Sequence, residues 1–440
     1  MSGCFRILGV SNHSIMRKTT LIVLAVLCAG LFVSCRQAGV PEAFNYSVKP
    51  EKLGVTQEKI DALDAVLQGF VDEQRVPCVT AFVAKGGDVV YEKSFGCKDL
   101  EKQIPARTDD IYVLFSQTKA IVAVALMTLY EQGKFDVEDP ISKYIPGFTD
   151  QVLTEVGDDG SFTAVPAERP VTIAHLLSHS SGYQAPLANK LNRMLIASGQ
   201  RQAAPRTTVG AAVEAAKDLP LGFQPGTEWN YNVDMDVIAY LVEILSGKTL
   251  QEYLKEVIFT PLGMDHTAYY FDDESLKERF VTTYTKRDGQ FVKAMSGADS
   301  VFDGPKTYAG GTYGLYGPIE DYAKFCQMLI NGGEFNHHRI LKEETIAMMR
   351  QNRLPEVNSG GKGFRFGLGF ELFDHPDKEK TAPQMSDSCF RWGGAAGTEY
   401  LMDPENDLVI LYYISMWGST NTYPTFLKAA YDLFQGPGEK

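Results

Sequence analysis

One short stretch places a hydroxyl and an amine at a spacing that could support nucleophilic catalysis. FSQTKAIVAVALM, residues 115–127, sets Ser116 and Lys119 three positions apart, and every residue from Ala120 to Met127 is apolar. Residues at i and i+3 share one face of a helix, so the amine can reach the hydroxyl. An all-apolar run predicts a buried helix, and burial would lower the pKa of the lysine. Its amine could then accept the serine proton.

The Ser-x-x-Lys pattern alone does not establish a catalytic site. In a chain of 440 residues it should occur about twice by chance. It occurs again at Ser359 to Lys362, but the glycines between them predict a loop that cannot hold both side chains on one helical face. An ordinary helix start therefore remains the alternative for Ser116. If a helix does begin there, its unpaired backbone N–H groups lie beside the hydroxyl and could stabilise an oxyanion.

A tyrosine precedes a second apolar helical pattern. In PGTEWNYNVDMDVIAYLVEILSG, Pro225 and Gly226 predict a turn, and Tyr231 lies in the loop that enters the helix. A phenol can transfer protons if a neighbouring ammonium lowers its pKa, and Lys119 would be that neighbour. The chain has 21 tyrosines, and most tyrosines serve packing, which is the alternative role for this one. Asp234 and Asp236 are expected to be helix-start charges rather than catalysts.

A third stretch, RWGGAAGTEYLMDP, carries two glycines inside a strand pattern. Gly393 and Gly394 interrupt the strand. Glycine in a strand marks either the close approach of a ligand or another backbone, or a β-bulge. Both interpretations remain open at this point.

The two ends of the chain carry the β signals. Helical spacing over 56–74, with Thr56 as a cap, is followed by two β-rich runs around Gly86 and Gly87 that predict a hairpin. The C-terminal third has β-rich runs at 363–373, 388–404 and 407–417 and a final helical pattern at 423–434.

Helical patterns and long loops dominate the middle of the chain. We therefore predict an α/β fold in which an antiparallel sheet, built from both chain ends and flanked by helices, receives an inserted, mainly helical lobe. The domain would span 51–440. Its helical lobe would cover about 116–290, and its α/β lobe 51–115 plus 291–440. The site should lie where the lobes meet.

The N-terminus has the pattern of an export signal. Two basic residues precede thirteen apolar or small residues and then Cys35. A cysteine after a small residue resembles the lipobox of bacterial lipoproteins, so residues 1–35 are expected to be a signal peptide, with Met16 as an alternative start, and 36–50 a linker. The mature protein would be exported to the periplasm or cell surface and lipid-anchored through Cys35. Plain cleavage or an uncleaved anchor is the alternative.

Composition excludes several partners. The formal charge is −13, and no basic patch stands out, which argues against nucleic acid and against an anionic membrane surface. Loss of residues 1–34 removes three basic residues and no acid, so the mature charge is −13 − 3 = −16. The membrane is expected to be contacted only through the lipid anchor. Oligomeric state is left open.

Cysteines and histidines indicate no metal site. Cys78 and Cys97 flank the predicted hairpin and could pair, but buried free thiols are favoured. His175 and His179 have the i, i+4 spacing of a metal pair, yet no third ligand accompanies them. We expect no metal and no cofactor.

The three stretches together resemble the serine hydrolase superfamily of penicillin-binding proteins, class C beta-lactamases and family VIII carboxylesterases. That family has Ser-x-x-Lys, then a tyrosine motif, then a Lys-Thr-Gly-type strand. Here the matching positions are Ser116 to Lys119, Tyr231 to Val233 and Trp392 to Gly394, and the similarity covers roughly residues 55–435. The resemblance implies a beta-lactamase/transpeptidase-like fold and catalysis through an acyl-enzyme.

The resemblance also implies a role for each matching residue. Ser116 would be the acylated nucleophile, Lys119 its activating partner, and Tyr231 the general acid or base. The backbone N–H groups of Ser116 and Ala395 would form the oxyanion hole. The substrate would contact Trp392, Gly393, Gly394 and Val233.

Two departures from the family pattern bear on the substrate. Beta-lactamases and D,D-peptidases usually carry Asn, which holds the substrate amide, where this chain has Val233. They carry Lys, which attracts the substrate carboxylate, where it has Trp392. Both changes resemble the esterase branch, so a carboxylesterase on small esters is expected. A D,D-peptidase or beta-lactamase is the alternative, with Arg391 or a loop residue as the missing cation, although strand alternation would point Arg391 to the opposite face. A non-catalytic exported binding protein is the second alternative.

Overall fold

The computed structural model describes residues 43–295, 298–354, 364–373, 382, 384–418 and 420–435. Pro41–Lys440 forms one compact unit. The expected signal peptide with its lipobox at Cys35, and the second Ser-x-x-Lys match, lie outside the described residues. Within the described ranges, no helix combines the length and the apolar character needed to cross a membrane.

An eight-stranded antiparallel sheet joins the two ends of the chain. The strand order is β12-β13-β14-β15-β16-β1-β2-β3. At its centre the N-terminal strand pairs with the C-terminal one, so that Phe82 lies opposite Leu411. This confirms the predicted sheet and its hairpin. The strands are β1 (Cys78–Lys85), β2 (Asp88–Asp99), β3 (Ile104–Pro105), β12 (Arg365–Phe366), β13 (Glu371–Leu372), β14 (Phe390–Gly394), β15 (Thr398–Asp403) and β16 (Leu408–Tyr413).

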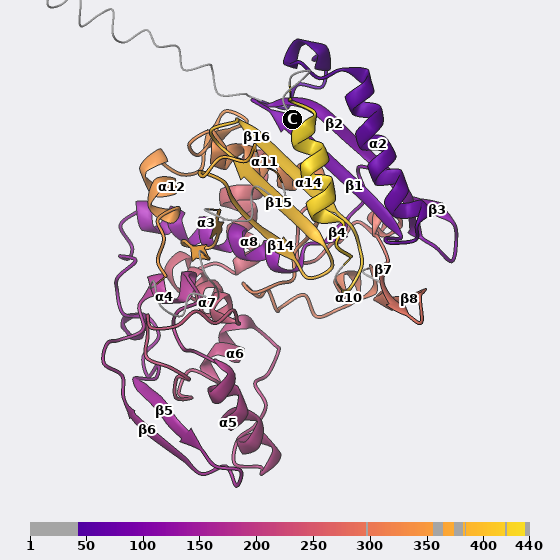
Figure 1. Ribbon diagram of the computed structural model, residues 1–440. Coiled ribbons are helices and arrows are strands. Elements are labelled where there is room, and N and C mark those ends of the chain that lie inside the picture. The colour runs from indigo at the N-terminus through magenta and orange to yellow at the C-terminus, as the bar shows by residue number, and fades with distance from the viewer. Residues whose placement is uncertain are drawn as a thin grey trace, which may run out of the picture. The chain divides into compact units, whose positions relative to one another are not determined.

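Helices cover both faces of this sheet (Figure 1). The terminal helices α2 (Gln57–Asp72) and α14 (Tyr423–Asp432) lie on one face, where alternate residues of β1 such as Val83 are buried. Phe82 points to the other face and joins the core that includes α11 (Ile319–Ile330). The Thr56 side chain accepts a hydrogen bond from Lys59 N, which confirms the predicted cap of α2.

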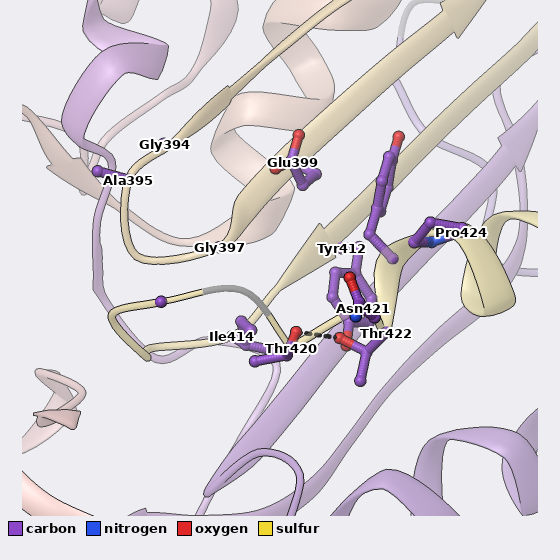
Figure 2. Close-up of a pocket in the computed structure, with 12 residues that line it drawn as sticks. Gly394, Ala395, Gly397, Glu399, Tyr412, Ile414, Thr420, Asn421, Thr422 and Pro424 are labelled. Atoms are coloured by element: carbon purple, nitrogen blue, oxygen red, sulfur yellow. Dashed lines mark hydrogen bonds between the residues drawn. The ribbon is translucent and has the colours of Figure 1, made fainter. Parts of the chain in front are cut away.

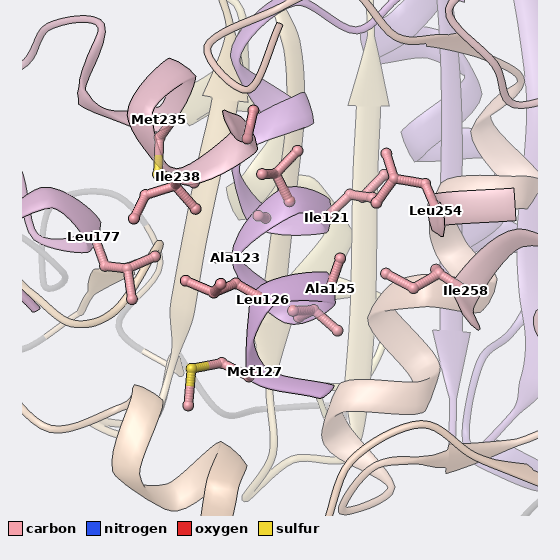
Figure 3. Packing of buried hydrophobic residues seen from close by; sticks show 14 of the residues in the cluster. Ile121, Ala123, Ala125, Leu126, Met127, Leu177, Met235, Ile238, Leu254 and Ile258 are labelled. Atoms are coloured by element: carbon pink, nitrogen blue, oxygen red, sulfur yellow. The ribbon is translucent and has the colours of Figure 1, made fainter. Parts of the chain in front are cut away.

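The helix that follows Ser116 lies at the centre of the larger core. A 3₁₀ turn, Phe115–Gln117, leads into α3 (Thr118–Glu131), and every residue from Ala120 to Met127 is buried. Figure 3 shows these side chains pointing outward on all sides of α3, toward α4 (Ile173–Leu177), α7 (Asp234–Ser246) and α8 (Leu250–Leu254). Burial of each large aliphatic side chain contributes roughly 1.5 to 3 kcal/mol, so α3 is held firmly from all directions.

Short helices and hairpins complete the fold. Within the middle of the chain, β5 (Gln151–Val156) and β6 (Phe162–Pro166) form an antiparallel hairpin. The remaining helices are α5 (Pro186–Ala197), α6 (Val209–Glu214), α9 (Thr260–Leu262), α10 (Ala298–Phe302) and α12 (Glu343–Met349), with 3₁₀ turns at Pro50–Leu53, Ile141–Lys143 and Glu274–Arg279 and a π-helical turn at Lys255–Phe259. The remaining strands are β4 (Tyr112–Val113), β5 (Gln151–Val156), β6 (Phe162–Pro166), β7 (Thr283–Arg287), β8 (Gln290–Met295), β9 (Tyr316–Gly317), β10 (Glu334–Phe335) and β11 (His338–Arg339).

The described part of the expected linker contacts the sheet. The Phe44 and Phe82 ring centroids lie 5.0 Å apart. The Asn45 side chain donates a hydrogen bond of 2.6 Å to Asp88 Oδ1. The chain therefore packs against the domain before residue 50. The four described cysteines, Cys78, Cys97, Cys326 and Cys389, are free thiols.

Candidate active site

Ser116 lies in a sharp turn just ahead of α3, rather than within its first α-helical turn. The preceding residue, Phe115, has a φ of +45°, which is rare for a bulky side chain and costs on the order of 1 to 3 kcal/mol. Its ring packs edge-on against Trp417 with centroids 4.7 Å apart. Packing thus holds a strained backbone in place immediately before the hydroxyl.

Lys119 approaches the Ser116 hydroxyl from within α3. Its Nζ lies 3.2 Å from Ser116 Oγ and donates to the carbonyl of Thr312 at 2.7 Å. The side chain is 2% exposed. This burial lowers the pKa of Lys119 to about 7, although the carboxylates of Asp236 and Asp234 act in the opposite direction. A large fraction of the amine is therefore uncharged near neutral pH and able to accept a proton.

A hydrogen-bonded aspartate fixes the carbonyl that holds Lys119. Asp236 Oδ1 accepts from the backbone N–H of Thr312 at 2.8 Å, and Oδ2 accepts from the Tyr308 hydroxyl at 3.2 Å. Asp234 and Asp236 do occupy the first turn of α7, as expected for helix-start charges. Asp236 has a second role that the sequence did not indicate, because it positions the acceptor of the Lys119 amine.

Backbone and side-chain hydrogen bonds fix the loop that carries Tyr231. Asn230 N donates to His179 O at 2.9 Å. The Asn232 side chain donates to Tyr183 O and accepts from Asp234 N. This side chain therefore binds one of the first N–H groups of α7, whose N-cap Val233 has no capping side chain. Tyr231 is held on both sides by these contacts.

The Tyr231 hydroxyl lies between Ser116 and the sheet. It hydrogen-bonds with Ser116 and accepts from Trp392 Nε1 at 3.2 Å. The Lys119 ammonium group lies over the ring, 4.5 Å from its centroid, rather than beside the hydroxyl. Burial raises the pKa of Tyr231 above its usual value. The expectation that Lys119 lowers this pKa is therefore wrong, and the phenol stays protonated at neutral pH.

Strand β14 presents alternate residues to opposite faces of the sheet. Trp392 faces Tyr231, and the two ring centroids lie 5.2 Å apart. A Cβ added at Gly394 would lie 2.4 Å from the carbonyl oxygen of Leu114. β14 pairs with β15 without a register shift. Close approach to the backbone before Ser116, and not a bulge, therefore explains the glycine at 394.

The other two residues of this motif face away from Ser116. Arg391 donates to Glu371 at 2.9 Å and to Glu399 at 3.2 Å. Strand alternation therefore points Arg391 to the opposite face, as predicted, and its charge is already paired there. A Cβ at Gly393 would lie 2.2 Å from a Glu399 carboxylate oxygen. The expected substrate contact at Gly393 would therefore involve only the backbone of this residue, because the absence of a side chain makes room for Glu399.

A tight turn follows Gly394 (Figure 2). Gly397 N donates to Gly394 O at 2.9 Å, and Gly397 has a φ of +80°, which suits glycine. Ala395 lies exposed in this turn, one residue beyond the close contact with Leu114. On the opposite side, the turn borders a cavity of about 230 Å³ that Glu399 also lines.

Aromatic rings surround Tyr231, and the sequence patterns did not reveal them. The rings of His179 and Trp229 lie 4.9 and 6.1 Å from that of Tyr231. Phe366 packs edge-on against Trp392 at 5.2 Å. These residues come from loops and a two-residue strand, where periodicity carries no information. Only a count of aromatics near the motifs could have suggested the cluster.

The two histidines with metal-like spacing have different surroundings. His175 Nδ1 accepts from Thr172 N at 3.1 Å as part of a capping box. His179 is 1% exposed, and burial lowers its pKa to about 3. Among the described residues, no group of three or more His, Cys, Asp or Glu side chains is placed to hold a metal ion.

Comparisons with known proteins cover almost the whole described chain. A family model described as Beta-lactamase matches residues 63–426. Esterase EstB of Burkholderia gladioli is 28% identical over 397 residues, covering 85% of this chain and 92% of that protein. A putative D-alanyl-D-alanine carboxypeptidase of Escherichia coli K12 is 26% identical over 419 residues, covering 90% of each. The structure of EstCE1, a hydrolase with promiscuous acyltransferase activity, has a TM-score of 0.71 at 23% identity and covers 85% of this chain and 99% of that one.

Proposed function

We propose that this chain, which belongs to the Beta-lactamase family of serine hydrolases, is a carboxylesterase that cleaves small esters through an acyl-enzyme on Ser116. The observation that carries the proposal is the 3.2 Å approach of a buried amine, with a pKa of about 7, to a serine hydroxyl. Such an amine can accept the serine proton at neutral pH, which a surface lysine cannot do.

Acylation would begin with proton transfer from Ser116 Oγ to Lys119 Nζ. The oxygen then attacks the ester carbonyl, and the carbonyl π electrons move onto its oxygen. The N–H groups of Ser116 and Ala395 are proposed to stabilise that oxyanion. Collapse of the intermediate breaks the bond to the leaving alkoxide. Tyr231, whose phenol is protonated, would donate a proton to the alkoxide and regain one from the Lys119 ammonium.

Deacylation would reuse the same groups with water as the nucleophile. Water loses one proton to the Tyr231 and Lys119 pair and attacks the acyl carbon. The intermediate then expels Ser116 Oγ, which takes the proton back, and the carboxylic acid leaves. No external reductant, oxidant or cofactor enters this cycle.

The surroundings of Ser116 favour esters over amides with a carboxylate. Val233 offers no hydrogen bond to an amide, the Trp392 indole donates to Tyr231, and the Arg391 charge is paired with two carboxylates on the other face. A desolvated amide without a partner costs about 1 to 3 kcal/mol, and an unpaired carboxylate costs more. The relative named as an esterase agrees with this preference. The relative named as a putative carboxypeptidase keeps a D,D-peptidase as the second candidate.

Three substrates assayed side by side test the proposal. We expect kcat/KM for p-nitrophenyl butyrate to exceed that for nitrocefin and for a D-Ala-D-Ala peptide by at least about a hundredfold, since two unpaired polar groups together cost a factor of that size. Faster hydrolysis of the peptide would replace the esterase assignment with a D,D-peptidase, and faster hydrolysis of nitrocefin would replace it with a beta-lactamase. A fluorophosphonate probe should label the wild type and not Ser116→Ala. Absence of wild-type labelling would instead indicate a non-catalytic binding protein.

We also propose that the mature protein is a lipoprotein that begins at Cys35, in the periplasm or at the cell surface. Two or more acyl chains on one cysteine anchor a protein stably, whereas one does not. Cys35→Ser should therefore move the protein from the membrane fraction to the soluble fraction after cell lysis. Wild type expressed in parallel is the control. Membrane retention of the variant would exclude lipidation at this cysteine.

A further inference from the structure

A small cavity is lined in part by Val233, which follows Tyr231 by two residues in the chain. Its volume is about 130 Å³. Side chains from several separate segments line it, including Tyr183, Gln184, Arg206, Val233, Asp236 and Tyr308. Gln184 has a φ of +47°, a conformation that costs free energy for a residue with a side chain and tends to occur at functional positions. Val233 belongs to the tyrosine motif, and the other residues that line the cavity belong to none of the motifs described above.

Arg206 supplies the only positive charge among the residues that line the cavity. Its guanidinium lies 5.6 Å from the ring centroids of both Tyr308 and Tyr313, and Nη2 donates to the Tyr313 hydroxyl. Contacts with aromatic faces hold a guanidinium in place without neutralising it. Arg206 forms no ion pair with a carboxylate of the described residues. Four of its five N–H donors thus have no part in the bond to Tyr313.

Arg206 is connected to the catalytic amine through two adjacent residues, Tyr313 and Thr312. Tyr313 directly follows Thr312, whose carbonyl accepts from Lys119 Nζ at 2.7 Å. Asp236, which lines the cavity, holds the N–H of the same Thr312 at 2.8 Å. Lys119 Nζ in turn lies 3.2 Å from Ser116 Oγ. The cavity is therefore lined by Val233, two residues after Tyr231, and by Asp236, which positions the acceptor of the Lys119 amine.

A positioned, unpaired guanidinium suits an oxyanion on the substrate. A carboxylate accepts two parallel hydrogen bonds from it, as a phosphate does, whereas a neutral alkyl group accepts none. The chain as a whole carries a charge of −13, which repels an anion at long range, so a local cation is needed for a carboxylate to bind. Both Asp236 oxygens already accept hydrogen bonds from Thr312 and Tyr308, which leaves Arg206 as the group that selects the ligand.

We propose that Arg206 is a specificity residue that binds a carboxylate at the distal end of the acyl group, so that dicarboxylate monoesters are preferred substrates. We assign Arg206 to the acyl side of the ester for the following reason. The leaving group would receive its proton from the Tyr231 hydroxyl, which faces Trp392. Val233 faces the cavity. The inference rests on the proposed esterase function and adds the substrate class to it. Arg206 touches neither Ser116 nor Lys119, and it does not take part in the chemistry.

Two esters that differ only at the end of the acyl chain test this assignment. Mono(4-nitrophenyl) adipate carries a carboxylate where 4-nitrophenyl hexanoate carries a methyl group. In Arg206→Gln, kcat/KM for the adipate ester should fall by about 10- to 100-fold, as expected for loss of a charge-assisted hydrogen bond. The value for hexanoate should change by less than about twofold. Arg206→Lys, which keeps the charge without the planar fork, should give an intermediate loss. Hydrolysis by Ser116→Ala is subtracted as background.

Arg193→Gln is the matched control. Arg193 is an exposed arginine on α5, so this variant changes the net charge equally but should leave both esters within about twofold of wild type. Equal losses for both esters in Arg206→Gln would show that Arg206 only positions its loop and would overturn the proposal. A loss in Arg206→Gln that is confined to 3-carboxy-4-nitrophenyl hexanoate would also overturn the proposal, because this ester carries its carboxylate on the leaving group. If wild type cleaves none of these esters, the esterase function itself fails, which is a separate result.

Discussion

Two buried lysines in this molecule have opposite surroundings. The Lys98 side chain is 7% exposed, and its Nζ lies 2.5 Å from a carboxylate oxygen of the fully buried Asp110. Lys119 is 2% exposed, and its Nζ contacts a hydroxyl and a carbonyl. Lys119 forms no ion pair within the described part of the chain. Burial is common to both, so the presence of a contacting carboxylate decides whether a buried amine serves structure or chemistry.

The carboxylates nearest to Lys119 are engaged elsewhere. Asp234 accepts from Ser181 Oγ at 2.8 Å, and Asp236 accepts from Thr312 N at 2.8 Å. Their charges still favour the ammonium form, but less than desolvation disfavours it, so the pKa of Lys119 falls to about 7. A carboxylate moved into contact with this amine would stabilise the ammonium and remove the base.

The largest expected effect comes from removing each amine in turn. Lys119→Ala should lower kcat/KM for p-nitrophenyl butyrate by at least about a thousandfold, nearly as much as Ser116→Ala, because residues that act as a unit are not additive. Lys98→Ala should keep kcat/KM within about tenfold for the fraction that is folded, since Lys98 contacts Asp110 and not Ser116. Active-site titration with a fluorophosphonate corrects for misfolded enzyme. Activity of Lys119→Ala within tenfold of wild type would refute the assigned role.

A smaller effect is expected when the ion pair loses its acid. Asp110→Asn leaves the Lys98 ammonium buried without its carboxylate, which should lower the free energy of unfolding by about 3 to 5 kcal/mol. The double variant Lys98→Met with Asp110→Leu removes both charges and should lose less than Asp110→Asn alone. Urea unfolding followed by circular dichroism measures both. A loss below about 1 kcal/mol in Asp110→Asn would mean that the pair does not stabilise the fold.

The smallest effect concerns pH and examines Lys119 without disrupting the Lys98–Asp110 ion pair. Between pH 7 and 9 the unfolded chain keeps the proton on Lys119, whose usual pKa is 10.5, whereas the folded chain, with a pKa of about 7, gives it up. The free energy of unfolding should therefore rise with pH by about 2 kcal/mol more in wild type than in Lys119→Met. Over the same range, kcat/KM should rise with an apparent pKa near 7, because the uncharged amine is the active form.

Parallel changes in unfolding free energy in wild type and Lys119→Met would contradict this titration. An activity profile that is flat across pH 6 to 8 would show that the amine does not titrate in this range. Either result would contradict a pKa of about 7 for Lys119.

Local patterns were sufficient to predict the parts of this molecule that depend on periodicity. The all-apolar run from Ala120 to Met127 predicted a helix buried on every side, and the structure has it. Strand alternation predicted that Arg391 faces away from Ser116, where Glu371 and Glu399 bind it. In both cases the side chain's direction follows from its own element alone.

Features that depend on contacts between distant segments were not predictable. The sequence did not distinguish Gly393 from Gly394, because one makes room for Glu399 and the other for the Leu114 carbonyl. The pKa of Tyr231 was expected in the wrong direction, since the desolvation of its hydroxyl depends on neighbouring segments brought together by folding. The positive φ of Phe115 likewise has no local signature, because packing against Trp417 maintains it.

The pairing of β1 with β16 determines when the enzyme can become active during its synthesis. Phe82 lies opposite Leu411, so the central strand of the sheet has no partner on that side until the ribosome has made almost the whole chain. At about 5 to 20 residues per second, this interval lasts roughly 15 to 60 s. Trp392 and Gly394, which complete the surroundings of Ser116, also emerge late. The nascent chain therefore cannot assemble its hydrolytic site, and an incomplete chain is not an active hydrolase.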